Sequence, residues 1–346
     1  MKVISVYIQL NTITLLYCQS FEIESSWDNF TDNAKVIVPN VIFKSETSNA
    51  SVGLDALLKK GDPIEIRAGY NKPSDELETL FKGFISNIKT GTILEISAQD
   101  AMYALKQKNV PSKLFKDAKL SELIDYCLEG IKLDVEYTKV ADKDVGLGDW
   151  AIENNSFQSP LAVFQQLKDW GIIITVRDGK LVVGQPYDAT GITHYFVKEI
   201  NIIEDSLTNE LNDTARVIKG IYRNDKNEKI IKYVSKINEK ILVTTDELQG
   251  TITKTLNFYN ISESDFDKLL EKAYQSTNYK GFKGDIVTFG EPYVKYNDWI
   301  KLRDLKNPER NGTYKVRSVK YEMSTSSGLR QTITTDFAIS EIQANS

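Results

Sequence analysis

Two short segments of this 346-residue chain each occur twice, in the same order. Thr31-Asp-Asn-Ala-Lys-Val-Ile-Val-Pro39 is similar to Asn212-Asp-Thr-Ala-Arg-Val-Ile-Lys-Gly220, and Gly61-Asp-Pro-Ile-Glu-Ile-Arg67 is similar to Asn297-Asp-Trp-Ile-Lys-Leu-Arg303. A predicted helix lies between the first and the second segment in both copies. The matches therefore indicate two related domains, and the longer spacing in the second copy indicates an insertion.

Strand-length runs in which apolar or β-branched residues alternate with polar ones fill residues 1–100 and return in residues 196–339. Val6, Ile8 and Leu10 give the first of them. A short helix is expected at residues 51–60, ended by Gly61, and another near residues 262–276, where Ser262 and Asp265 resemble a capping box.

Residues 101–195 have a different, helix-rich pattern. Apolar residues recur at helical spacing in residues 101–106 and 120–127, and Ser159-Pro160 is typical of a helix start. Asp178-Gly179 between two apolar runs predicts a β-hairpin. Together the patterns predict an α+β fold that is mainly β. Two related β-barrel-like domains, at residues 1–100 and 196–346, would flank a small α/β insert domain at residues 101–195.

Composition excludes several classes of protein. The net charge of −5 and the absence of a basic cluster disfavour tight binding to a nucleic-acid backbone. No apolar run is long enough to span a bilayer, and polar residues such as Gln9 and Asn11 interrupt the only stretch that resembles a secretion signal. We therefore expect synthesis in the cytoplasm and no membrane insertion. Cys18 and Cys127 are too far apart in the sequence to indicate a disulfide framework or a thiolate metal site.

Signals for catalysis are weak. His194 is the only histidine, and no Gly-x-Ser-x-Gly elbow, P-loop or dinucleotide fingerprint accompanies it. The carboxylate pairs Glu22/Glu24 and Asp142/Asp144 have the spacing of neighbours on a solvated strand face, although such pairs can act in glycosidases. We predict no catalytic, cofactor-binding or metal-binding residues, no cofactor and no enzymatic activity.

Aromatic residues allow another interpretation. The four tryptophans, Trp27, Trp150, Trp170 and Trp299, can form a sugar platform, but core or interface positions fit their sequence contexts better. The aromatic and glycine-rich stretch from Tyr279 to Tyr296 is expected to be a loop or edge segment that contacts a neighbouring subunit.

Three segments carry a resemblance to a known family. They are an entry strand and polar turn at residues 21–34, the Ser159-Pro-Leu-Ala-Val-Phe-Gln-Gln-Leu helix with the hairpin at residues 178–181, and the unit from Asn311 to Ile333. In this order they resemble the baseplate hub proteins of contractile phage tails, a family that includes the hub portion of type VI secretion spike proteins. The resemblance covers nearly the whole chain, although no extended β-helical repeat follows it.

The resemblance implies a structural virion protein that links the tail tube to the spike. It implies a homotrimer whose paired domains make a ring of six around a channel, through which DNA passes without specific binding. Tube and spike proteins would be the partners, and the tail baseplate would be the location. A carbohydrate-binding adhesion module and a tail-associated cell-wall hydrolase remain alternatives, and the sequence does not distinguish a phage, a domesticated prophage and a secretion device.

Overall fold

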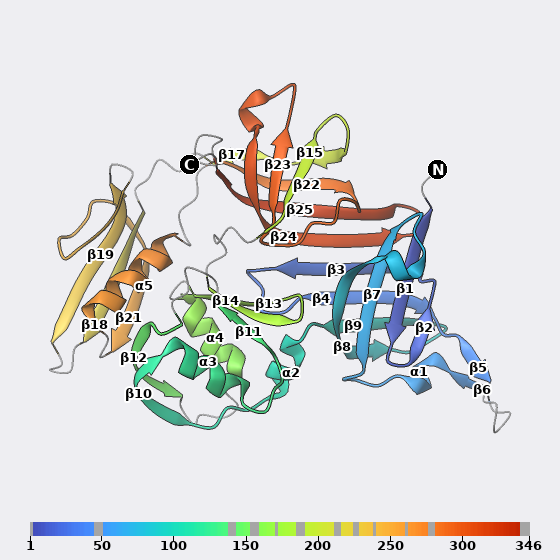
Figure 1. Ribbon diagram of the computed structural model, residues 1–346, viewed down its shortest axis with the longest axis horizontal. Coiled ribbons are helices and arrows are strands. Elements are labelled where there is room, and N and C mark those ends of the chain that lie inside the picture. The colour runs from blue at the N-terminus through green and yellow to red at the C-terminus, as the bar shows by residue number, and fades with distance from the viewer. Residues whose placement is uncertain are drawn as a thin grey trace. The chain divides into compact units, whose positions relative to one another are not determined.

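The computed structural model (Figure 1) describes most of the chain. The described residues are 3–44, 51–137, 143–152, 159–169, 172–184, 191–210, 216–223, 228–237, 240–259, 262–275 and 281–339. The fold is α+β and mainly β, as the sequence predicts. No helix among these residues is long and apolar enough to cross a membrane.

Contacts group the chain into two units, each assembled from separate stretches. Unit 1 contains residues 1–103, 190–209 and 282–346, and unit 2 contains residues 104–189 and 210–281. The chain thus leaves unit 1 twice and returns to it twice. The division into three domains, at residues 1–100, 101–195 and 196–346, stays a prediction.

One 14-stranded sheet forms most of unit 1, in the order β16-β22-β25-β24-β3-β4-β9-β8-β7-β1-β2, with β15, β17 and β23 attached at its sides. Its strands are β1 (Ile4–Leu10), β2 (Ile13–Leu15), β3 (Ser20–Ser26), β4 (Asn33–Pro39), β7 (Pro63–Tyr70), β8 (Glu78–Lys89), β9 (Ile93–Gln99), β15 (Thr193–Val197), β16 (Ile202–Asp205), β17 (Thr208–Glu210), β22 (Gly281–Phe289), β23 (Trp299–Arg303), β24 (Gly312–Ser324) and β25 (Gly328–Ile339).

Alternating burial explains why these segments form strands. Ile8 and Leu10 on β1 are fully buried, and Ile23 on β3 and Val36 on β4 face the same core. Residues that alternate with them, such as Gln9, Glu22 and Lys35, are polar and lie on the other face of the sheet, the arrangement expected when one face of an antiparallel sheet is buried. Short 3₁₀ helices, η1 (Ser74–Glu76) and η2 (Pro308–Arg310), lie in two of the connections.

The helix expected at residues 51–60 is mostly absent. Residues Ser51–Gly53 form β6, which pairs with β5 (Ile42–Lys44), and only Leu54–Leu57 are helical, as α1. Strand pairing with residues 42–44 outweighs the helical spacing, and the N-cap position of α1 is occupied by Gly53, which has no side chain to cap the helix.

Unit 2 contains three smaller sheets and the longer helices. The sheets have the orders β10-β12, β11-β14-β13 and β20-β19-β18-β21. The elements are α2 (Met102–Gln107, at the boundary with unit 1), β10 (Lys113–Lys119), α3 (Leu120–Leu128), β11 (Val135–Tyr137), β12 (Gly146–Ile152), α4 (Pro160–Asp169), β13 (Ile173–Arg177), β14 (Lys180–Gly184), β18 (Arg216–Arg223), β19 (Lys229–Ile237), β20 (Lys240–Thr244), β21 (Thr251–Tyr259) and α5 (Glu263–Gln275). Asp178 and Gly179 join β13 to β14 with φ of 52° and 77°, as a type I′ hairpin turn requires.

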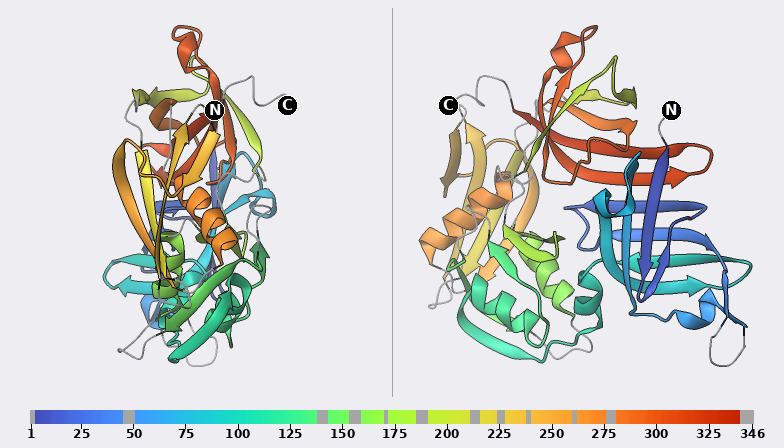
Figure 2. Two further views of the ribbon diagram at one scale, coloured as in Figure 1. Left: turned by 90° about the vertical axis from the view of Figure 1, so that its left-hand side faces the viewer. Right: turned by 45° about the vertical axis from the view of Figure 1, so that its right-hand side comes forward.

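Helix α5 packs on the four-stranded sheet of unit 2 (Figure 2). Its start is capped as the sequence predicts, because the Asp265 N–H donates to Ser262 Oγ at 3.2 Å. The Phe266 ring lies 4.6 Å from that of Tyr222 on β18. Gly220 on β18 makes this close packing possible, since a Cβ there would lie 2.6 Å from Leu270.

Candidate assembly site

A turn closed by a buried aspartate precedes β7, and a turn with the same hydrogen bonds precedes β23. Asp62 accepts a hydrogen bond from the Lys59 N–H at 2.9 Å, and Asp298 accepts one from the Lys295 N–H at 2.9 Å. In return the Asp62 N–H donates to the Lys59 carbonyl at 3.2 Å, and the Asp298 N–H to the Lys295 carbonyl at 3.1 Å. Both aspartates are at most 4% exposed. The two turns therefore have one structure.

The residue before each aspartate has a left-handed backbone conformation. Gly61 has φ of 87° and Asn297 has φ of 68°, and glycine and asparagine are the residues that adopt it most easily. Each of them donates its N–H to a neighbouring strand, to the Ile85 carbonyl and the Val316 carbonyl respectively, both at 2.8 Å. Ile85 on β8 and Val316 on β24 are therefore equivalent positions.

The equivalence continues through a β-bulge. On β8, Ile85 pairs with Ala98 and Asn87 with Ser97, so that one residue is extra. On β24, Val316 pairs with Thr335 and Ser318 with Thr334, again with one extra residue. Because bulges interrupt regular pairing at defined positions, a bulge at the same step of both strands indicates one architecture used twice.

The strands that follow β8 and β24 in the sheet are equivalent as well. Ala98 on β9 pairs with Ala34 on β4, and Thr335 on β25 pairs with Gly284 on β22. We call β3, β4, β9, β8 and β7 the N-terminal strand set, and β16–β17, β22, β25, β24 and β23 the C-terminal strand set. The two sets have the same order of strands in the sheet.

One of the two sequence matches is not part of this duplication. The segment at residues 31–39 lies on β4, but the part of its match that the structure describes, residues 216–220, lies on β18 in unit 2. The interpretation of this match as a domain repeat is therefore wrong, because the strand equivalent to β4 is β22. Residues 211–215 lie outside the described residues. The match between residues 61–67 and 297–303 coincides with the repeated turn.

The two strand sets join where the second half of β24 pairs with β3 (Figure 1). Ser318 to Ser324 run antiparallel to Ser20 to Ser26, with Lys320 opposite Glu24. Lys320 Nζ lies 3.3 Å from Glu22, 3.9 Å from Glu24 and 3.0 Å from Glu322. Residues 20–26 and 318–324 thus form the seam between the sets.

The corresponding half of β8 has an unpaired edge. β7 pairs with β8 only as far as Phe84, and no strand in the described part of the chain pairs with residues 86–89 on this side. Ile88 is equivalent to Val319 on β24. Val319, with β3 beside it, is 2% exposed, whereas Ile88 is only partly buried. The C-terminal half of β8 therefore lacks the neighbour that its counterpart has.

The strand equivalent to β3 ends the sheet. Asp205 on β16 pairs with Ile286 as Phe21 on β3 pairs with Val36, and Leu207 occupies the buried position of Ile23. β16 is the last strand in the sheet order, and β17 is attached beside it to β22. Edges of this kind leave backbone N–H and carbonyl groups available to another strand.

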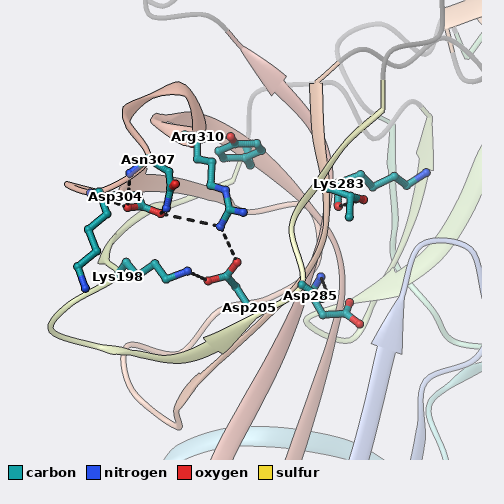
Figure 3. A network of polar contacts seen from close by, with 11 residues as sticks. Lys198, Asp205, Lys283, Asp285, Asp304, Asn307 and Arg310 are labelled. Atoms are coloured by element: carbon teal, nitrogen blue, oxygen red, sulfur yellow. Dashed lines mark hydrogen bonds and ion pairs between the residues drawn. The ribbon is translucent and has the colours of Figure 1, made fainter.

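A network of charges fixes this terminal strand (Figure 3). Asp205 contacts Lys198 Nζ and also accepts a hydrogen bond from Arg310 at 3.0 Å. Asp304 lies 3.9 Å from the same guanidinium and accepts the N–H groups of Lys306 and Asn307 at 2.9 and 2.8 Å. These hydrogen bonds hold the pKa of Asp304 below its usual range, although its burial acts in the opposite direction. The edge strand is thereby tied to the loop after β23.

His194 has a structural position. Its Nε2 lies 3.0 Å from Asp298 Oδ2, and its side chain is 12% exposed. The same carboxylate closes the turn before β23 and accepts the Ile192 N–H at 3.2 Å. The pair therefore fastens β15 to the turn that begins β23. No group of three or more His, Cys, Asp or Glu side chains within the described ranges has the arrangement of a metal site.

The other residues considered from the sequence are the tryptophans and the carboxylate pairs. Trp27, Trp150 and Trp299 are each at most 6% exposed, so these three form no sugar platform, and Trp170 lies outside the described residues. Glu22 and Glu24 share the solvent face of β3 and contact Lys320, as a solvated pair would. Asp144 is exposed, and Asp142 lies outside the described residues.

The sequence predicts a loop or edge segment at residues 279–296. This prediction is wrong for residues 281–289. Residues 281–289 form β22, which lies between β16 and β25 within the sheet. The tyrosines that follow face inward: Tyr293 donates its hydroxyl to the Ala68 carbonyl, and Tyr296 is 5% exposed. These aromatic residues pack within unit 1, and residues 279 and 280 lie outside the described residues.

No protein-family model matches this chain, and no curated protein matches its sequence. Solved structures do match its fold. A tail protein from Neisseria meningitidis MC58 superposes with a TM-score of 0.67 at 13% identity, over 96% of each chain. The 43 kDa tail protein of prophage MuSo2 from Shewanella oneidensis gives 0.63 at 12% identity, over 96% of this chain and 97% of that one.

A third match comes from a secretion system. An Escherichia coli component of the type VI secretion system, described as structurally similar to bacteriophage T4 tail proteins, gives a TM-score of 0.56 at 10% identity. It is matched over 96% of this chain and 77% of its own length. The chain therefore has the fold of phage tail proteins of the baseplate-hub type.

Proposed function

We propose that the chain is a non-enzymatic hub subunit of a phage tail or a related injection machine. In this role it forms a homotrimer between the tail tube and the spike, and the trimer surrounds a channel through which DNA passes. The virion is its place of action. The repeated turn and strand order within unit 1 are the observation that carries the proposal.

The duplicated strand sets allow a ring of three chains to have both three-fold and approximate six-fold symmetry. Each chain supplies two strand sets of one architecture, so three chains supply six. A ring of three copies would therefore present a six-fold arrangement to a tube and a three-fold arrangement to a spike. Cyclic symmetry also closes head-to-tail contacts without making an open fibre.

The solvent face of the sheet is compatible with passing DNA. Three of its lysines lie beside carboxylates: Glu95 is 3.2 Å from Lys35 and 2.9 Å from Lys89, and Lys320 contacts three glutamates. Lysines neutralised in this way hold phosphates weakly, because binding to the nucleic-acid backbone depends on unpaired positive charge.

Light scattering on purified full-length chain over a range of concentrations tests the assembly. The chain has a mass of 39.2 kDa, and we expect a species of three chains at high concentration, or after co-expression with tube and spike proteins from the same genome. Electron micrographs of that species should show rings with six similar lobes around a hole.

A chain that stays monomeric in all these samples contradicts the hub role. Incubation with purified cell wall addresses the hydrolase alternative, because release of soluble fragments that is lost on changing one carboxylate would contradict a purely structural role. Binding to immobilised glycans would favour the adhesion alternative.

A further inference from the structure

We propose that Asp32 and Asp100 form a proton-operated latch, which fastens the start of α2 while Asp32 is protonated and releases it when both carboxyls are ionised. The latch acts within one chain and is independent of the proposed trimer. It lies where the chain first leaves unit 1, because the boundary between the two units falls within α2. The event that it controls is local opening of the first turn of this helix.

The two aspartates lie opposite each other at the end of a strand pair. β4 and β9 pair antiparallel as far as Asn33, which lies opposite Gln99. Asp32 and Asp100 are the next residues, and the Asp100 N–H donates to the Asp32 carbonyl at 3.1 Å. Like charges directly opposite each other destabilise a strand pair. The backbone pairing therefore places two acidic residues where they repel each other if both are ionised.

The Asp100 carboxylate connects this strand end to α2. Its Oδ2 accepts the Asp32 N–H at 3.1 Å, and its Oδ1 accepts the Met102 N–H at 3.0 Å. The Tyr103 N–H donates to the Asp100 carbonyl at 3.0 Å. Asp100 is 5% exposed, and Met102 is fully buried. The first turn of α2 thus depends on a carboxylate that also contacts Asp32.

The Asp32 carboxyl favours its protonated form. Its burial, and then the charge of Asp100, raise its pKa well above the usual range. Hydrogen bonds from the Ser25 side chain and from the Ser26 N–H, the latter at 3.3 Å, favour the ionised form but are outweighed. Ionising both members of the pair is therefore costly, and the two carboxyls titrate as one system.

Other titratable groups lie on the elements around the pair. They are Glu24 on β3, Asp28 in the connection between β3 and β4, Lys82 on β8, Tyr103 and Lys106 on α2, Arg317 on β24 and Asp336 on β25. Arg317 contacts both Asp28 and Asp336, the latter at 3.6 Å. The charge that shifts the pKa of Asp32 is that of Asp100. The latch therefore depends on this pair of aspartates.

Raising the pH should open the latch. Because the pKa of Asp32 is higher in the closed form than in an open one, the closed form binds the proton more tightly. This advantage is complete below the ordinary pKa of an aspartate and is lost as the pH rises through the pKa of the closed form. Ionised Asp32 then repels Asp100, which holds the first turn of α2.

Hydrogen exchange of the full-length chain, measured by mass spectrometry at a series of pH values, tests the latch. After correction for the intrinsic pH dependence of exchange, we expect the protection of the Met102 and Tyr103 amides to fall by up to about tenfold per pH unit, as the loss of one proton requires. Asp32→Asn keeps an acceptor for the Ser26 N–H but cannot ionise, so its protection at these amides should stay level.

The matched control is Asp75→Asn, which changes an exposed aspartate of η1 and should keep the wild-type dependence on pH. Infrared spectroscopy gives a second measurement. The wild-type chain should show the band of a protonated carboxyl at pH values where ordinary aspartates are ionised, and Asp32→Asn should lack it.

Several outcomes would overturn the latch. One is protection at the start of α2 that does not change with pH in the wild type, and another is a pH dependence that Asp32→Asn retains. Equal loss of protection in β4, β9 and α2 would overturn it as well, because unit 1 would then open as a whole. If Asp32→Asn does not fold, the infrared band and the exchange of the wild-type chain decide.

Discussion

Asp62 and Asp298 lie 236 positions apart in the sequence, yet each accepts the backbone N–H of the residue three positions earlier at the same distance of 2.9 Å. Each carboxylate is buried and each follows a residue with a left-handed backbone. The shared turn therefore sets the start of β7 and of β23, and with it the register of the strands that follow.

Removing either carboxylate should destabilise unit 1. Asp62→Ala leaves the Lys59 N–H without its acceptor, which typically costs about 1–3 kcal/mol of unfolding free energy. Asp298→Ala should cost more, because Asp298 also accepts the Ile192 N–H at 3.2 Å and contacts His194. Urea denaturation followed by circular dichroism measures both. The exposed Asp75→Ala is the control, and a loss equal to that of Asp62→Ala would contradict the role of the turn.

The Asp32 carboxyl should make stability depend on pH. Its burial, and then the nearby charge of Asp100, raise its pKa well above the usual range. A carboxyl whose pKa is higher in the folded chain stabilises the fold when protonated, and this contribution disappears as the pH rises through the folded pKa.

Asp32→Asn, which is uncharged throughout, should therefore gain unfolding free energy over the wild type at pH 7 and lose most of this advantage at pH 4. Urea denaturation at a series of pH values gives the comparison. Asp75→Asn serves as the control, and an advantage for Asp32→Asn that grows toward pH 4 would show that the sign is wrong.

Both cysteine thiols should be unreactive in the folded chain. Burial raises the pKa of Cys18 and of Cys127 to about 12, so neither forms appreciable thiolate at neutral pH. We expect slow reaction with a disulfide reagent such as DTNB, and rapid modification of both cysteines in guanidinium chloride. Rapid reaction of the native chain would indicate that one of these thiols is accessible.

Gly220→Ala should weaken the packing of α5 on its sheet in unit 2. The added Cβ would lie 2.6 Å from Leu270 and 2.7 Å from Phe266, and overpacking of this kind costs about 1–3 kcal/mol. Gly91→Ala, whose Cβ would approach no atom closer than 3.4 Å, is the matched control. Thermal denaturation of the two variants compares them, and equal midpoints would contradict the tight approach.

Local signals in the sequence were sufficient for most elements. Alternation of apolar residues predicts β1, β3 and β4, and helical spacing predicts α3. Ser159-Pro160 predicts the start of α4, and Asp178-Gly179 predicts the hairpin. In each case the side chains that decide the structure are close together in the sequence. The helix expected at residues 51–60 is the exception, because a strand pairing with residues 42–44 competes with it.

The sequence indicates the pairing of distant strands much less clearly. β4 and β18 share an alternating pattern and even several residues, but only the sheet shows that β22 is the counterpart of β4. The repeated turn is recognisable in the sequence because it needs a carboxylate after a residue with positive φ. The candidate assembly edges are not recognisable there, since backbone groups rather than particular side chains define them.

The seam between β3 and β24 has a consequence for synthesis at the ribosome. Glu22 and Glu322 are cross-strand partners, so nearly the whole chain is translated before β3 meets the strand that covers it. Until then a nascent chain presents an open, half-apolar strand to other nascent chains, which is the situation in which wrong strand pairing occurs. Slow translation of the last third of the chain should therefore increase aggregation, and a separately supplied peptide of residues 312–339 should reduce it.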